Sequence, residues 1–344
     1  MSKETLKQFF THEYEVLKPF INTYAKNINF NHIIDPFAGE GHLLRLVENK
    51  RVTAIDIDPD VKPDIIANSF TSIPKQSDET IIITNPPYSH RHILQKQDQR
   101  HYKIVTEAGY TDLYEYAIKR VIDQCQNLHM FALIPENFIA SRTVKLRAEI
   151  YKRIRAIQIH ELSTCQDTDQ PTIMIYLAPT ECNQTDLWLS ATRIGAIKIK
   201  PDGFRPTIQC RNNYVEFGIK EGQSQKCRDN SILLQATDGG TPDNRIKLMR
   251  VSDHFKGMKH FINKISDRAY IQIVPHKVMT EDQINILIIY FNKWVDNWRK
   301  STHGLGLTSF RSNVARNGIN FRRKRIDFKL ARLIINYIIE HHII

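Results

Sequence analysis

The first half of the chain alternates short β-like runs with segments of helical spacing, and this alternation most constrains the fold. The β-like runs occupy residues 31–36, 52–57, 80–84 and 129–134. The helical patterns occupy residues 40–49, 112–125 and 144–153. Such alternation is typical of an α/β protein with a parallel sheet. Two further β-like runs, 155–161 and 172–177, flank a polar stretch and predict a closing β-hairpin, so the expected sheet has mixed strand directions.

The charge of the chain is unevenly distributed, which indicates two domains. Residues 1–180 contain 21 Lys and Arg against 22 Asp and Glu, whereas residues 181–344 contain 27 against 15. The second half has short strand-like pieces and two helical runs, 281–299 and 327–341, and predicts a smaller α+β domain. Its excess positive charge favours a polyanion such as nucleic acid as partner. A basic surface that serves only solubility is the alternative.

The first chemical motif, Asp35-Pro36-Phe37-Ala38-Gly39-Glu40-Gly41, lies between a β-like run and a helical pattern. Glycines at such a junction allow a sharp turn and a close approach of the backbone to a nucleotide-type cofactor. A dinucleotide fingerprint would have a third glycine at Leu44, so NAD is disfavoured.

The next β-like run ends at Asp56 and Ile57, about 20 residues after the glycine-rich motif. A carboxylate at this place can accept both hydroxyl hydrogen bonds of a ribose. We choose Asp56 rather than Asp58 as the ribose ligand, because Asp58 precedes a proline and suits a turn better. The alternative is that both carboxylates only cap the turn.

The third motif, Asn85-Pro86-Pro87-Tyr88, directly follows the β-like run 80–84. Two prolines fix φ and remove N–H donors, so Asn85 Oδ1 and the Pro86 carbonyl form a rigid pair of acceptors. An exocyclic amine on a heteroaromatic ring is a poor nucleophile, because its lone pair is delocalised. Two acceptors on its hydrogens favour tetrahedral geometry and free the lone pair to attack a methylsulfonium. Tyr88 offers an aromatic face to a base swung out of the helix.

Taken in order, the three motifs resemble those of the amino-methyltransferases of restriction-modification systems, specifically the N6-adenine DNA methyltransferases of the γ arrangement. In that arrangement the cofactor motif comes first, the catalytic motif second and the target-recognition domain last. The resemblance covers roughly residues 8–180. It implies a Rossmann-like methyltransferase domain over residues 1–180 with S-adenosyl-L-methionine as cofactor, and a DNA target-recognition domain over residues 181–344.

The resemblance also implies individual roles. The cofactor pocket is expected to involve Thr11, Asp35, Phe37, Gly39, Gly41, Asp56, Ile57, Ser69, Phe70 and Asn85. Thr11 belongs to a leading motif in which His12 stands where the family usually has proline. The family usually reads the adenine of the cofactor with an Asp before Phe or Leu. Here Ser69 precedes Phe70, and Asp64 is a second candidate. The runs 112–114 and 133–136 match family segments that back the active site.

Two basic segments are candidates for contact with DNA. After Tyr88, the polar segment with Arg91, Arg100 and Lys103 lacks apolar periodicity and predicts a flap that orders over DNA, or else a solvated loop. In the second half the densest basic cluster consists of Arg311, Arg316, Arg322, Arg323, Lys324 and Arg325. Such residues bind phosphates, and some arginines read guanine edges. The alternative is a basic solvated face.

The expected function is site-specific methylation of N6 of a flipped-out adenine in duplex DNA, which protects the site from a cognate restriction endonuclease. An rRNA base N-methyltransferase is the leading enzymatic alternative, because the acceptor pair suits any planar amine. Methylation of cytosine N4 more commonly has Ser in place of Asn85. Glutamine methyltransferases that act on release factors carry their extra domain ahead of the cofactor motif, unlike this chain. A catalytically inactive DNA-binding specificity protein is the non-enzymatic alternative.

Bulk features predict the surroundings of the protein. No apolar run approaches the roughly 20 residues that span a bilayer, and the N-terminus lacks a secretory pattern. The five cysteines are scattered without zinc-ligand spacing. We therefore expect a cytoplasmic monomer with reduced thiols, no metal and no membrane partner, with duplex DNA as substrate and a restriction endonuclease as candidate functional partner.

Overall fold

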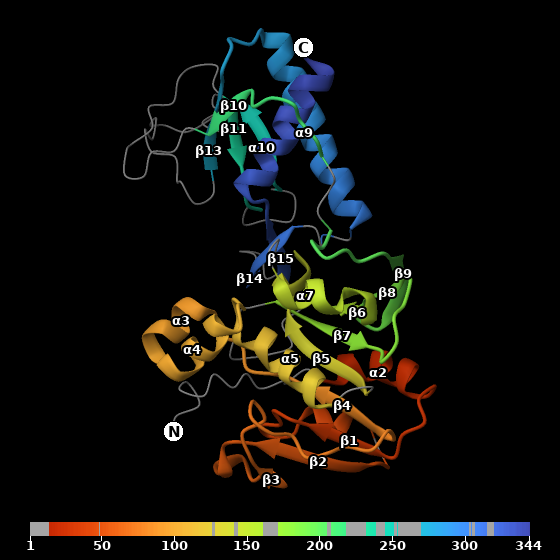
Figure 1. Cartoon of the computed structure of the whole chain (residues 1–344). Helices are drawn as coiled ribbons and strands as arrows, with labels where there is room; N and C mark the ends of the chain where they lie inside the picture. The colour runs from red at the N-terminus through yellow and green to blue at the C-terminus, as the bar shows by residue number, and fades with distance from the viewer. Residues whose placement is uncertain are drawn as a thin grey trace. The chain divides into compact units, whose positions relative to one another are not determined.

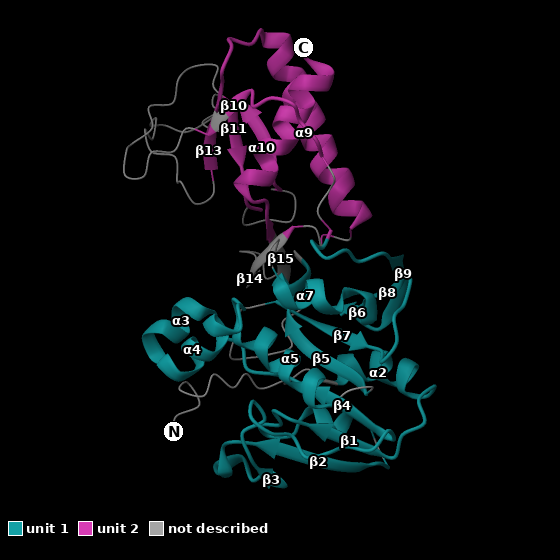
Figure 2. Ribbon diagram, in the orientation of Figure 1, with its two compact units in different colours: residues 1–203 teal, residues 204–344 magenta. Residues whose placement is uncertain are grey.

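The chain divides into two compact units, residues 1–203 and residues 204–344 (Figure 2). The computed structural model describes residues 14–344 except 48, 126–127, 141–143, 161–170, 205–207, 218–231, 239–244, 251–252, 254–269, 303, 305–306 and 315–319. The division falls after Gly203 rather than after residue 180, because two further strands hydrogen-bond to the sheet of unit 1. The charge asymmetry persists, since unit 2 contains 24 Lys and Arg against 12 Asp and Glu.

Unit 1 is built on a nine-stranded sheet with the order β3-β2-β1-β4-β5-β7-β6-β8-β9 (Figure 1). Its strands are β1 (His32–Asp35), β2 (Arg51–Asp56), β3 (Ile65–Ile66), β4 (Thr80–Thr84), β5 (His129–Pro135), β6 (Ile154–Ile159), β7 (Thr172–Leu177), β8 (Thr185–Leu189) and β9 (Thr192–Ile197). The first five strands in the sheet order are parallel. Strand β7 runs antiparallel between β5 and β6. This arrangement confirms the predicted Rossmann-like sheet of mixed strand directions and its closing hairpin.

The helical elements of unit 1 match the predicted runs 112–125 and 144–153 and differ from the prediction elsewhere. They are η1 (Tyr14–Leu17), α2 (Lys18–Ala25), η2 (Leu43–Leu46), η3 (Pro59–Val61), α3 (Arg91–Gln97), α4 (Gln99–Glu107), α5 (Leu113–Gln124), α6 (Asn137–Ala140), α7 (Lys145–Ile150) and η4 (Tyr151–Arg153). The helix expected over residues 40–49 is wrong: only the single turn η2 forms, because Gly39 and Gly41 have positive φ and β2 begins at Arg51. After Tyr88, helices α3 and α4 occupy the segment that the sequence predicts to be an irregular flap or loop, and its contact with DNA stays a prediction.

The central strands of the unit 1 sheet are buried on both faces. Ile33, Ile81 and Phe131 belong to one apolar cluster together with Phe20 of α2. Neighbouring residues along a strand point to opposite faces, and Ile82, the neighbour of Ile81, is also fully buried. Parallel strands covered on both faces require such continuous apolar runs. The functional positions are therefore the polar residues at the strand ends.

Unit 2 is an α+β unit, as expected. Its four-stranded antiparallel sheet has the order β10-β13-β11-β12, and β14 and β15 form a separate ribbon. The elements are β10 (Val215–Phe217), β11 (Ile232–Gln235), β12 (Lys247–Arg250), β13 (Tyr270–Pro275), α9 (Glu281–Ser301), β14 (Thr308–Val314), β15 (Asn320–Arg325) and α10 (Phe328–His342). Helix α9 begins with a capping box between Thr280 and Gln283, and Asp327 caps α10. In the described part of the chain, no helix is long and apolar enough to cross a bilayer.

A buried ion pair ties together separate segments of unit 2. The two Nη atoms of Arg299, in the last turn of α9, donate to the two carboxylate oxygens of Asp238 at 2.7 and 3.0 Å. The same carboxylate accepts from the backbone N–H groups of Ile246 and Lys324 at 3.1 and 2.8 Å. Asp238 is only 3% exposed, and these four hydrogen bonds help to stabilise its buried charge.

Candidate active site

The polar residues singled out in the sequence end three neighbouring strands of unit 1. Asp35 ends β1 and Asp56 ends β2, while Asn85 directly follows β4. Strand β1 pairs in parallel with both β2 and β4. The three side chains therefore start from the same, carboxyl edge of the sheet, which is where ligands bind in open α/β sheets.

The glycine-rich turn after β1 is bonded to the end of β2. The backbone N–H of Gly39 donates to Asp56 Oδ2 at 2.8 Å, and that of Asp58 donates to Oδ1 at 2.9 Å. Gly39 and Gly41 have φ of 51° and 72°, a region that favours glycine. A Cβ on Gly41 would meet no described atom within 4 Å, so open space lies beside this turn. Ile57, which follows Asp56, is 49% exposed.

Asp35 is a buried carboxyl that joins β1 to β4. Its Oδ1 accepts from Thr84 Oγ1 at 2.7 Å and from the Phe37 N–H at 3.0 Å. Burial raises the pKa of Asp35 to about 7, and the nearby Asp56 carboxylate adds to the rise, while the two hydrogen bonds oppose it. Thr84 thus positions the strand ends, a role that no sequence motif indicates.

The raised pKa of Asp35 predicts a pH-dependent stability. The pKa of Asp35 in the folded protein lies above its value of about 4 in the unfolded chain. The stability that this carboxyl contributes is therefore fully present below pH ~4 and is lost as the pH rises through about 7. Asp35→Asn keeps an acceptor oxygen without the charge. Between pH 5 and 8 the free energy of unfolding, measured in urea, should fall by ~2–3 kcal/mol more in the natural protein than in this variant. Equal slopes would contradict the assignment, and Asp60→Asn, at an exposed position, serves as control.

The two aromatic residues assigned to the cofactor lie together. The ring centroids of Phe37 and Phe70 are 5.3 Å apart. Phe70 also contacts His101 at 5.2 Å and stacks on Tyr116 at 5.7 Å. No sequence motif singles out His101 or Tyr116. Phe37 follows β1 and Phe70 follows β3, so both aromatic residues lie at the carboxyl edge of the sheet. This shared position explains why their rings meet.

The two candidates for the adenine contact differ in their surroundings. Asp64 Oδ2 accepts from the Ala54 N–H at 2.8 Å and therefore supports the start of the β2–β3 pairing. Ser69 is 3% exposed, and its hydroxyl has no hydrogen-bond partner among the described residues. A buried hydroxyl without a partner is costly unless a ligand or water satisfies it.

The Asn85-Pro86-Pro87-Tyr88 segment leaves β4 with Asn85 half-buried. The Tyr88 hydroxyl lies within hydrogen-bond distance of Asn85 Oδ1 and of the Leu133 carbonyl oxygen, the latter at 2.9 Å. A phenol has one proton and donates to one of the two oxygens at a time. The Tyr88 ring is only 4% exposed, so here it orients the carboxamide rather than presenting an open face. Stacking against a base stays a prediction.

The runs 112–114 and 133–136, which match family segments behind the active site, both contact residues 85–89. The Leu113 N–H donates to the Ser89 carbonyl at 2.8 Å, and the Tyr114 ring packs edge-on against Tyr88 at 6.4 Å. Leu133, in β5, supplies the carbonyl that faces the Tyr88 hydroxyl. The catalytic segment is therefore held from α5 and from β5.

The basic candidates fall into three groups. Arg91, Arg100 and Lys103 are exposed on α3 and α4, and Arg325 is exposed at the end of β15. Lys324 is 7% exposed, so its assignment to an exposed phosphate-binding surface is corrected: its side chain is buried within unit 2 beside Gly304. The structure does not describe Arg316, nor the side chains of Arg311, Arg322 and Arg323. Thr11, which was predicted to lie in the cofactor pocket, is also outside the described residues.

Comparison with known proteins finds likeness only among solved structures. No protein-family model and no curated protein matches the chain. A putative class I S-adenosylmethionine-dependent methyltransferase from Listeria monocytogenes is 13% identical, with a TM-score of 0.37, and the match covers 52% of this chain and 62% of that one. The M protein of the type I restriction enzyme EcoKI is 14% identical, with a TM-score of 0.36 and coverages of 53% and 48%.

A third match is the DNA-bound, ATP-dependent type ISP restriction-modification enzyme LlaBIII, which is 12% identical with a TM-score of 0.41. The match covers 69% of this chain and 26% of that enzyme. This chain therefore spans less than two thirds of the length of each of the three proteins. At these identities the likeness assigns no activity, which has to be argued from the site.

Proposed function

We propose that this protein is an S-adenosylmethionine-dependent methyltransferase that methylates N6 of a flipped-out adenine in duplex DNA. The observation that carries the proposal is the placement of Asn85. Its carboxamide follows β4 at the same sheet edge as the Gly39–Gly41 turn and Asp56, and the Tyr88 hydroxyl contacts its oxygen. An oriented amide oxygen beside a nucleotide-type pocket suits the activation of an exocyclic amine.

The residues at this edge fit the proposed cofactor. Open space beside Gly41 leaves room for a ligand close to the backbone, and Asp56 stands where a ribose diol can donate to it. The Ser69 hydroxyl has no partner among the residues that the structure describes, and it adjoins the Phe37–Phe70 aromatic pair, which supports Ser69 rather than Asp64 as the adenine contact. When bound, S-adenosylmethionine supplies an electrophilic methyl group on a sulfonium.

The residues of the catalytic segment would act by binding and orienting the target amine. Asn85 Oδ1 has two lone pairs, so it can accept from the Tyr88 hydroxyl and from one amine hydrogen together. The Pro86 carbonyl would accept the second hydrogen, and the prolines hold both oxygens in place. An amine held in this way would become pyramidal and nucleophilic; taking up the methyl group would break the methyl–sulfur bond, leave a neutral thioether and release one amine proton to solvent. No covalent intermediate with the protein is required.

Unit 2 would supply the binding energy for a flipped base. Flipping costs a few kcal/mol of unstacking, and the excess positive charge of unit 2 can offset it through phosphate contacts.

Combined replacement of Arg322, Arg323 and Arg325 by Gln should weaken DNA binding. The log–log slope of affinity against salt should flatten by about 0.9 for each lost phosphate contact, measured by fluorescence anisotropy.

A matched control uses exposed lysines of α9, in the double variant Lys293→Gln and Lys300→Gln. If this control flattens the slope as much as the arginine variant, binding reflects the general charge of unit 2. An unchanged slope in the arginine variant would place the DNA-binding surface elsewhere.

The direct test is to incubate a mixed-sequence plasmid with the protein and labelled S-adenosylmethionine, and to map the modified base by single-molecule sequencing. We expect N6-methyladenine within one short recognition sequence. Label in cytosine N4 would change the assigned base. Label transferred to ribosomal RNA and not to DNA would overturn the substrate, and cofactor binding without any transfer would favour an inactive specificity protein.

A further inference from the structure

One face of helix α5 holds a turn beside the candidate cofactor pocket. The turn comprises residues 68–73, which follow β3 at the carboxyl edge of the sheet and lie outside helices and strands. It carries Ser69 and Phe70, and the Phe70 ring meets Phe37 of the glycine-rich turn at 5.3 Å. Residues 116, 120 and 124 of α5 are spaced four apart, so they lie on one face of the helix. All three contact the 68–73 turn.

Arg120 binds the main chain of this turn. Its Nε donates to the Phe70 carbonyl at 2.9 Å, and one Nη donates to the Thr71 carbonyl at 3.4 Å. In the described part of the chain no carboxylate pairs with Arg120, so its guanidinium serves these carbonyl groups. Hydrogen bonds from a charged donor are stronger than those between neutral groups. The backbone directly after Ser69 is therefore fixed from α5.

Gln124 brings both polar atoms of its carboxamide to the same turn. Its Nε2 donates to the Ser69 carbonyl at 3.1 Å, and its Oε1 accepts from the Ile73 N–H at 2.7 Å. Within the turn, Asn68 accepts from the Phe70 N–H with its side chain at 3.0 Å. The turn is thus bonded from two sides, with α5 holding three of its carbonyls and one N–H, and Asn68 holding another N–H.

The third contact from α5 orients the Phe70 side chain. The Tyr116 ring stacks on Phe70 with 5.7 Å between centroids and 25° between ring planes, and His101 of α4 meets the same ring at 5.2 Å. A turn outside helices and strands has few backbone bonds of its own, so ordering it only when a ligand binds would reduce affinity. The contacts from α5 order its backbone and its aromatic ring beforehand.

We propose that Arg120 and Gln124 are positioning residues that hold the 68–73 turn preordered for the adenine ring of the cofactor. Neither side chain contacts the cofactor itself, because each acts through the backbone of Ser69, Phe70 or their neighbours. The inference rests on the proposed function, which places the adenine beside Ser69 and Phe70. Loss of either side chain therefore weakens cofactor binding without removing a group that touches the ligand.

The first measurement is a calorimetric titration of the full chain with S-adenosylhomocysteine. Arg120→Gln and Gln124→Leu should each raise its dissociation constant by about tenfold, because the turn loses its preordering bonds. Arg120→Lys keeps a donor for the Phe70 carbonyl and should restore part of the affinity. The matched control is Lys119→Gln, which removes one positive charge from the same helix but from a side chain that pairs with Asp123. It should leave the dissociation constant unchanged.

Two further measurements separate positioning from a general structural role. In Arg120→Gln, the KM for S-adenosylmethionine should rise, whereas kcat for plasmid methylation at saturating cofactor and the dissociation constant for DNA should stay the same. Hydrogen exchange, measured by mass spectrometry without ligand, should become faster in peptides that cover residues 66–76 and stay the same in those of β4 and β5.

Unchanged S-adenosylhomocysteine binding in both Arg120→Gln and Gln124→Leu would overturn the inference. Faster exchange throughout unit 1 would also overturn it, because the contacts would then serve the stability of the whole unit. If the natural protein does not bind S-adenosylhomocysteine at all, the proposed function fails. That outcome is distinct from binding by the natural protein that the two variants leave unchanged.

Discussion

Replacing Asn85 by Ala should lower the rate of methyl transfer to DNA by about 10²–10³-fold, the usual effect of removing one oriented polar group from the reacting atoms. The amide oxygen is the acceptor that would make the target amine nucleophilic. Its removal leaves Asp56, the Gly39–Gly41 turn and unit 2 in place, so dissociation constants for S-adenosylmethionine and DNA should change by a few-fold at most. Single-turnover transfer and equilibrium binding measure the two effects separately.

A matched control is Asn29→Ala, at an exposed position outside the site. It should leave transfer and binding unchanged. If transfer by Asn85→Ala stays within a few-fold of the natural rate, the acceptor role is wrong. If cofactor binding collapses together with transfer, Asn85 belongs to the cofactor pocket rather than to the activation of the amine.

Replacing Asp238 by Ala should lower the free energy of unfolding of unit 2 by about 3–5 kcal/mol, because it leaves a buried charge uncompensated. The Arg299 side chain, 12% exposed, would lose both of its bonds to the carboxylate. Two backbone N–H groups, of Ile246 and Lys324, would lose their acceptor. Hydrogen exchange of α9 peptides, measured by mass spectrometry in the full chain, reports this loss locally.

The control for this prediction is Glu281→Gln, which removes a carboxylate that is 59% exposed from its pair with Arg250. An exposed pair contributes at most about 1 kcal/mol, so exchange in α9 should barely change. Equal effects of the two replacements would show that the Asp238 contacts do not hold α9 in place.

The positions of the main site residues are predictable because local patterns determine them. A β-like run followed by a polar motif places that motif at a strand end, and parallel strands bring their carboxyl ends to one edge. On this reasoning Asp35, Asp56 and Asn85 are expected at one edge of the sheet, and the strands that precede them end at that edge. The same reasoning fails for residues 40–49, where the positive φ of two glycines and the early start of β2 leave room for only one turn.

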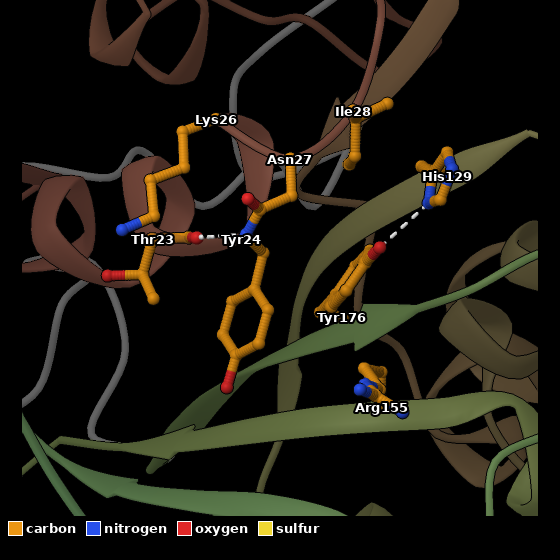
Figure 3. A pocket seen from close by; sticks show the side chains of 8 residues that line it. All are labelled: Thr23, Tyr24, Lys26, Asn27, Ile28, His129, Arg155 and Tyr176. Atoms are coloured by element: carbon orange, nitrogen blue, oxygen red, sulfur yellow. Dashed lines mark hydrogen bonds between the residues drawn. The ribbon is translucent and has the colours of Figure 1, made fainter.

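Periodicity, charge and strand-end motifs are local properties, so the order of amino acids alone is enough to predict the α/β architecture, the basic second half and the order of the motifs. Long-range packing, by contrast, buries Tyr88 and Lys324, adds β8 and β9 to the first sheet, and joins Asp238 to Arg299. Burial and pairing depend on segments far apart in the chain, so no local pattern reports them. The same holds for a pocket lined by Tyr24, His129, Arg155 and Tyr176, whose walls come from α2, the residues that follow it and three strands (Figure 3).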